Sequence, residues 1–134
     1  MINLFEVRSI QVLKHYYGEI YYDSYSIEFD DVIVKGNKIR TDFIYPIIYK
    51  SKENNSIAAR IYFRGRIESD EPIAEAKKID EFWTKERSLP LAFVNPMIQL
   101  IHTECRARGV LLSYAIEFPP PFKPPKIEIT INKK

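Results

Sequence analysis

The segment Val94–Gly109 predicts an amphipathic helix whose two ends are both marked in the sequence. Asn95 is a residue type that accepts a hydrogen bond from a first-turn N–H, and Pro96 suits the first helical position, where a missing N–H costs nothing. Gly109 supplies the left-handed residue that commonly follows a helix. Between these ends, apolar side chains recur at helical spacing: Met97, Ile98, Leu100, Ile101 and Cys105. A helix with this stripe needs a partner surface, and the chain before it is typical of strands.

The first half of the chain alternates in hydrophobicity with the two-residue period of strands. Residues 9–29 are rich in tyrosine and β-branched side chains, which predicts one strand with a bend at Gly18 and the start of a second strand that includes 32–35. Pro46 interrupts the next strand, 38–50, and predicts a sheet edge or a bulge there, because proline cannot donate a ladder hydrogen bond. That strand alternates strictly, so one face would carry Ile39, Thr41, Phe43, Tyr45, Ile47 and Tyr49.

A polar hairpin loop at 51–56 leads into another alternating strand over 57–67. One face of this strand carries Ile57, Ala59, Ile61, Phe63 and Ile67, and the other carries Arg60, Arg64 and Arg66. The charged segment 69–87 has apolar side chains at helical spacing and predicts a short helix or an ordered crossover loop. Residues 110–118 are typical of a strand, the proline-rich run 118–126 excludes a helix, and 126–134 alternate again. The pattern predicts an α+β fold with a four-stranded antiparallel sheet and one long helix.

Composition limits the classes of function. The chain has 134 residues and a net charge of +2, and its basic residues are scattered, so nucleic acid is an unfavoured partner. Cys105 is the only cysteine, which excludes an intrachain disulfide and favours a reducing compartment. The N-terminus has no signal-peptide pattern, and no window has the length and hydropathy of a membrane span. We therefore expect a single cytoplasmic domain that does not insert into membranes.

Catalytic and metal-binding motifs are missing from the sequence. His102 and Cys105 lie three residues apart on the helix, but two ligands do not make a metal site, and His15 is the only other histidine. We therefore expect a packed cysteine and a histidine on the helix face. There is no nucleophile elbow, phosphate-binding glycine loop or HExxH motif, and no pair of carboxylates stands out. The sequence predicts a protein that is not an enzyme and has no cofactor or metal.

Aromatic side chains are more numerous than a small core needs. The chain has nine Tyr and eight Phe, and the run FPPPFKPPK would hold Phe118 and Phe122 on a stiff polyproline segment. These rings either fill the space between sheet and helix or form an adaptable apolar surface for other polypeptides. On the second reading, the predicted polypeptide-binding residues are Trp83, Phe118, Phe122, Tyr22 and Phe29. The alternative function is a small nucleic-acid-binding protein that uses Arg60, Arg64 and Arg66.

The order of these elements resembles the SecB-type molecular chaperones over roughly residues 9–125. Val12–Asp23, VLKHYYGEIYYD, is similar to the first strand of that family, and Ile61–Ile67, IYFRGRI, has the family's glycine four residues after an apolar one. The helix VNPMIQLIHTECRARG has the family's spacing from proline to glycine, and FPPPF resembles the proline-rich turn that follows.

This resemblance implies an ATP-independent holdase, a chaperone that binds unfolded or extended polypeptides in apolar grooves. Members of the family assemble as dimers of dimers through the long helix, and they serve protein export or protect an antitoxin. Glu19 and Asp23 match positions that dock a partner in the family. Because one small sheet covers only part of a helix, we expect a homo-oligomer, dimer or tetramer, partly through the helix residues Met97, Leu100, Ile101 and Cys105.

Overall fold

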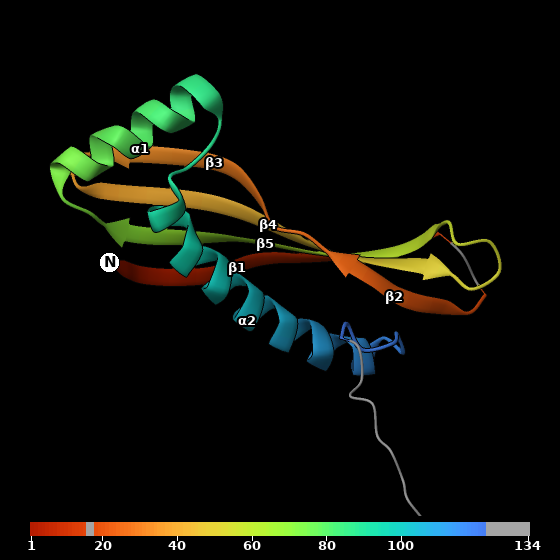
Figure 1. Ribbon diagram of the computed structural model, residues 1–134. Helices are drawn as coiled ribbons and strands as arrows, with labels where there is room; N and C mark the ends of the chain where they lie inside the picture. Colours follow the sequence, from red (N-terminus) through yellow and green to blue (C-terminus); the bar gives the residue numbers. More distant parts are fainter. Residues whose placement is uncertain (16–17, 123–134) are drawn as a thin grey trace, which may run out of the picture.

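The computed structural model describes residues 1–15 and 18–122, which form an antiparallel sheet with two helices on one of its faces (Figure 1). The strands are β1 (Ile2–Lys14), β2 (Ile20–Tyr25), β3 (Glu28–Lys35), β4 (Lys38–Ser51) and β5 (Ile57–Asp70). The helices are α1 (Ile73–Glu86) and α2 (Leu91–Ala115). The strand order is β1-β5-β4-β2, with β3 also paired to β4. The α+β antiparallel architecture is confirmed, with five strands instead of the predicted four and with two helices.

The additional strand arises from the segment predicted as one bent strand. Gly18 lies in the connection between β1 and β2, and these two strands are at opposite sides of the sheet. β2 and β3 then pair one after the other along the same edge of β4. The N-terminal residues before Ser9 also belong to β1, which begins at Ile2. The periodicity therefore identified extended chain correctly, but it could not identify which strand pairs with which.

β4 is the central strand, and its predicted alternation is confirmed. Its fully buried face carries Ile39, Thr41, Phe43, Tyr45, Ile47 and Tyr49. Pro46 is not on an edge strand, because it pairs in register with Tyr62 of β5, but on its other side it has no ladder partner and lies between the pairings of β2 and β3. The Pro46 carbonyl accepts a hydrogen bond from the Ser26 N–H at 3.2 Å, between the end of β2 and the start of β3. Its missing N–H points toward the same side, where the neighbouring strand changes and no ladder donor is needed.

α1 confirms the helix predicted within 69–87. Ala76, Ile79 and Trp83 are its buried residues, and they pack on Val32 and Ile39 of the sheet. These five side chains form one of two core clusters, at the end of the sheet where β3 lies. The segment predicted as a short helix therefore covers the end of the sheet that α2 leaves open.

α2 is longer than predicted at both ends. It begins after Pro90, whose carbonyl accepts hydrogen bonds from the N–H groups of Phe93 and Val94, so Asn95 is not the N-cap and Pro96 lies inside the helix. Gly109 also lies inside the helix, which corrects the predicted end and the predicted strand at 110–118.

Gly109 has a packing role instead. A Cβ atom there would lie 2.8 Å from Ile47 Cδ1 and 3.2 Å from Pro121 Cγ. The glycine therefore permits a close approach of the helix to the sheet and to the proline-rich turn. Tyr49 fixes the same turn by donating its hydroxyl to the Pro119 carbonyl at 2.9 Å. In the described part of the chain, neither helix has the length and hydropathy to cross a membrane. The predicted alternating tail, 126–134, lies outside the described residues.

Candidate functional site

Two of the predicted polypeptide-binding residues belong to the protein's own core. Trp83 is only 7% exposed in the cluster beneath α1, and the Arg87 guanidinium lies over its ring at 5.2 Å. Phe118 is also 7% exposed and packs edge-on against Tyr49, with ring centroids 5.1 Å apart. Rings enclosed in this way have little area to offer a client, so the structure corrects both assignments in favour of the core reading.

Phe29 is half-buried in β3 and packs against both core clusters, away from the groove described below. The two residues predicted for partner docking lie at or near β2, and each has a lysine beside it. Glu19 lies 3.6 Å from Lys52 Nζ, and Asp23 lies 3.4 Å from Lys50 Nζ. The charges of these two acids and two lysines cancel, so this site would attract a basic partner only weakly.

The remaining predicted aromatics, Tyr22 and Phe122, lie beside a groove along α2. This groove, hereafter the α2 groove, has a volume of about 620 Å³ and is open to solvent. It is lined by His102, Thr103, Arg106, Ala107, Val110, Leu111 and Phe122. Six of these residues come from successive turns of α2, and Phe122 comes from the proline-rich turn that Tyr49 and Gly109 hold against the helix. The groove is therefore mainly apolar, with its few polar groups on the flank of the helix.

The margin of the groove toward β2 is aromatic. Tyr25 is 43% exposed and stacks on His102, with ring centroids 4.5 Å apart. The Tyr45 hydroxyl and His102 Nδ1 form a hydrogen bond of 3.0 Å, which fixes the imidazole against that ring. Burial lowers the pKa of His102, and the Arg106 charge lowers it further, so the ring is held neutral. Tyr22 lies three residues before Tyr25 in β2 and is half-buried, and this burial raises the pKa of its hydroxyl.

The outward face of α2, opposite its buried residues, is uncharged. The predicted interface residues Met97, Ile101 and Cys105 are completely enclosed by the protomer, and burial raises the pKa of the Cys105 thiol to about 12. Leu100 alone of that set remains half-exposed. A different set of residues recurs at alternating spacings of four and three along the outward face: Pro96, Leu100, Thr103, Ala107, Val110 and Tyr114. We call this set the α2 seam; its spacing and small side chains are those of a helix–helix contact.

The arginines of β5 lie on the sheet face that no described helix covers, as the alternation predicts. Arg66 donates to Asp42 at 3.1 Å, and the Arg64 guanidinium lies over the Tyr62 ring at 5.9 Å. Arg60 is half-exposed in the same strand. The acids Glu6, Asp42 and Glu68 lie among these cations in the strand register. Over the described strands, the face therefore carries no continuous basic stripe of the kind typical of nucleic-acid binding.

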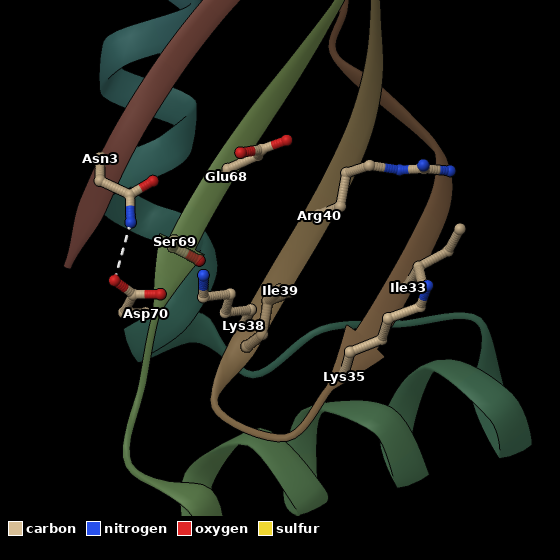
Figure 2. Close-up of a pocket in the computed structure, with 9 residues that line it drawn as sticks. All are labelled: Asn3, Ile33, Lys35, Lys38, Ile39, Arg40, Glu68, Ser69 and Asp70. Atoms are coloured by element: carbon tan, nitrogen blue, oxygen red, sulfur yellow. Dashed lines mark hydrogen bonds between the residues drawn. The ribbon is translucent and has the colours of Figure 1, made fainter.

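A separate hollow of about 370 Å³ lies at the end of the sheet where β3 and β4 meet (Figure 2). In the strand register, Lys38 lies opposite Asp70 and Arg40 opposite Glu68, whereas Lys35 lies opposite Lys38. Asp70 also accepts a hydrogen bond from the Asn3 amide at 2.8 Å. The described lining of this hollow therefore contains charges of both signs, three basic side chains and two acidic ones.

The residues weighed as metal ligands are placed apart. His102 stacks at the groove margin, whereas Cys105 lies in the core. Among residues 1–15 and 18–122, no group of three or more His, Cys, Asp or Glu side chains is arranged to hold a metal ion.

The fold is similar to that of a solved chaperone. The SecB-like chaperone Rv1957 of Mycobacterium tuberculosis, determined in complex with a ChAD peptide from the HigA1 antitoxin Rv1956, superposes with a TM-score of 0.62. The alignment covers 100% of this chain and 92% of the other, at 12% sequence identity. No family model matches the sequence, and no curated protein matches it. The structural likeness shows that the chain has a SecB-like fold.

Proposed function

We propose that this protein is an ATP-independent chaperone that binds extended segments of unfolded polypeptides in the α2 groove. The observation that carries the proposal is the groove itself: an open channel of about 620 Å³, lined by small and apolar side chains with aromatic rings at its margin. A surface of this kind binds many sequences by several weak contacts. The SecB-like fold, whose solved neighbour holds an antitoxin peptide, supports the same reading.

The free edge of β2 supplies the backbone contacts for such a segment. β2 pairs with β4 on one side only among the described residues, and its inward rings, Tyr22 and Tyr25, flank α2. A client strand added at this edge would satisfy the unpaired N–H and C=O groups of β2. Its inward side chains would lie between those rings and the helix. Backbone hydrogen bonds would give affinity without sequence dependence, as a chaperone requires.

We also propose a homo-oligomer, dimer or tetramer, in which the α2 seam of one protomer packs on that of another. Thr103 and Ala107 at its centre allow two helix backbones to approach closely, and Tyr114 at its end is 66% exposed. The seam and the groove share Thr103, Ala107 and Val110. A second copy on the seam would therefore narrow the groove to the strip beside β2.

The client class that we favour is an antitoxin held before it folds, because the structural neighbour is solved with an antitoxin peptide. Protein export is the alternative client pathway. The cytoplasm suits either role, and the single cysteine is buried. We propose no catalytic role, cofactor or metal for this chain.

Suppression of client aggregation tests the proposed function. A chemically denatured client is diluted into buffer without nucleotide, and light scattering is recorded with and without the protein. Phe122→Ser and Tyr25→Ser should each weaken protection, since an aromatic anchor contributes on the order of 1–2 kcal/mol to a bound segment. Phe82→Ser is the matched control, because Phe82 is 42% exposed on α1 and lies outside the groove. Failure of the wild-type protein to suppress aggregation, or equal losses in all three variants, would refute the proposal.

A further inference from the structure

The α2 groove has one permanently charged side chain, that of Arg106. Its guanidinium lies over the Phe122 ring, 5.7 Å from the centroid, and the residue is exposed. The nearest comparable residue on the helix, Arg108, is held by Glu104 in an ion pair of 2.7 Å on the other flank. Arg106 makes no ion pair with a described residue. A cation over an aromatic ring, beside an apolar channel, is poised to receive a carboxylate.

The groups around the groove leave this charge uncompensated. Among the described residues of the lining, His102 is the only other titratable one, and burial together with the Arg106 charge lowers its pKa and keeps it neutral. The same guanidinium also lowers the pKa of Tyr22 and of Tyr45 against the larger effect of burial, so its field reaches the margin toward β2. Asp23, the acid on β2, lies beside Lys50. Among the described residues, the groove therefore carries one positive charge, that of Arg106, with no acid paired to it.

We propose that Arg106 makes the α2 groove select polypeptide segments in which an acidic residue accompanies an aromatic or aliphatic one, and reject segments with a basic residue there. This inference rests on the proposed function. Side chains of an added strand that face the same way recur every second residue, about 7 Å apart. A segment added antiparallel to β2, as every strand pair of this sheet runs, would therefore place its apolar side chain near Tyr25 and its acid near Arg106 when one residue separates the two. The selected pattern is apolar–any–acidic.

Fluorescence anisotropy on a matched set of peptides tests this selection. The probes are short fluorescein-labelled peptides of alternating valine and serine with a central Phe-Ser-Asp, Phe-Ser-Asn or Phe-Ser-Lys. An exposed arginine–carboxylate pair changes affinity by about 1.5- to 5-fold. We therefore expect the wild-type protein to bind the Asp peptide about 1.5- to 5-fold more tightly than the Asn peptide, and the Lys peptide more weakly than either. High salt should reduce these differences, because the pair is exposed.

Substitutions at Arg106 test whether this residue causes the preference for the Asp peptide. Arg106→Gln should bind all three peptides alike, and Arg106→Glu should prefer the Lys peptide. Arg64→Glu is the matched control: it changes the net charge by the same amount at an exposed arginine on the opposite face of the sheet. This control should keep the preference for Asp. Because Arg106 is exposed, both variants at this position should melt near the wild-type temperature.

The outcomes separate this inference from the function on which it rests. Equal affinities of the wild-type protein for the three peptides, or a preference that persists in Arg106→Gln, would overturn the selection and leave the chaperone function intact. A preference lost equally in Arg64→Glu would show a nonspecific effect of net charge and would also overturn it. Absence of binding to every peptide would overturn both proposals.

Discussion

Gly65 in β5 is the position where a single added carbon should do the most damage. A Cβ atom there would lie 2.5 Å from Phe43 Cζ and 2.7 Å from Phe43 Cε1, and it would overlap the backbone carbonyl oxygen of Glu6. Phe43 is fully buried. The Glu6 carbonyl belongs to β1, which pairs with β5 at Val7 and Gly65 and shifts register directly afterwards, between Val7 and Ser9. Neither neighbour can withdraw without loss of core packing or strand pairing.

The expected cost of Gly65→Ala follows from these contacts. Overpacking a tight core costs about 1–3 kcal/mol, and displacement of the β1 backbone adds about 1 kcal/mol for each weakened ladder hydrogen bond. Alanine restricts the unfolded chain, which returns about 0.4–1 kcal/mol. We therefore expect the free energy of unfolding to fall by about 3 kcal/mol. At about 4 °C per kcal/mol for a domain of this size, the melting temperature should drop by about 12 °C.

Urea and thermal unfolding followed by circular dichroism measure this loss. Gly36→Ala is the control, because Gly36 has a φ of +63° and nothing lies within 4 Å of its added Cβ. That variant should lose only the cost of a left-handed alanine, about 1 kcal/mol. If Gly65→Ala lost no more than Gly36→Ala, the close approach of β1 and Phe43 to the glycine would be refuted.

Three further expectations follow from the core and the groove margin. Trp83→Ala should lower the free energy of unfolding by about 3–5 kcal/mol in urea titrations, and a variant that lost client binding at unchanged stability would contradict its place in the core. Because the pKa of His102 is lowered in the fold, the unfolded chain binds its proton first, so the free energy of unfolding should decrease as the pH falls below about 6.5. Urea titrations across that range should show a shallower decrease in His102→Gln, and an unchanged slope would assign the effect elsewhere. With a pKa of about 12, the Cys105 thiol should resist alkylation near pH 8 in the folded protein and react in denaturant, as a mass-spectrometric time course would show.

The local sequence pattern was sufficient to predict those features of the fold that belong to a single strand or a single helix. The strict alternation from Ile39 to Tyr49 identified a face that is buried at every predicted position, because a strand puts successive side chains on opposite faces whatever it pairs with. Two features depend instead on which strand pairs with each residue of β4: the break between β2 and β3, and the position of Pro46 opposite that break. That information is distributed over the sheet and does not appear in the spacing of one strand.

The predicted ends of α2 failed for a related reason. Asn95 and Pro96 form a good start signal in isolation, but Pro90 supplies an earlier one, and Val94 is buried against the core before the predicted start. Glycine is the residue type that commonly follows a helix, yet Gly109 lies inside α2, where it allows the close approach of Ile47. This contact forms only when the chain folds. End signals are weak when tertiary packing continues past them.

The candidate site was half accessible to sequence reasoning. The aromatic surplus included Tyr22 and Phe122, which lie at the candidate groove, but it also included Trp83, which is buried in the core. His102 and Arg106 were not identified as binding residues, because their neighbours come from other elements. Their spacing of four residues, which places both on one flank of a helix, was the available signal.

The distribution of charge on α2 suits the three roles proposed for it: packing in the core, binding a client and contacting a second protomer. Its charged residues are Glu104, Arg106 and Arg108 in a helix of 25 residues, and all three lie on its flanks. An ordinary surface helix would put charges on its outward face to keep that face in water. Here the outward face keeps the uncharged α2 seam. Glu104 and Arg108 neutralise one another on one flank, whereas Arg106 at the groove makes no ion pair with any residue of 1–15 and 18–122. If a client occupies the groove and a second protomer the seam, as proposed above, each must change the affinity for the other, because the two surfaces share Thr103, Ala107 and Val110; this linkage is reciprocal.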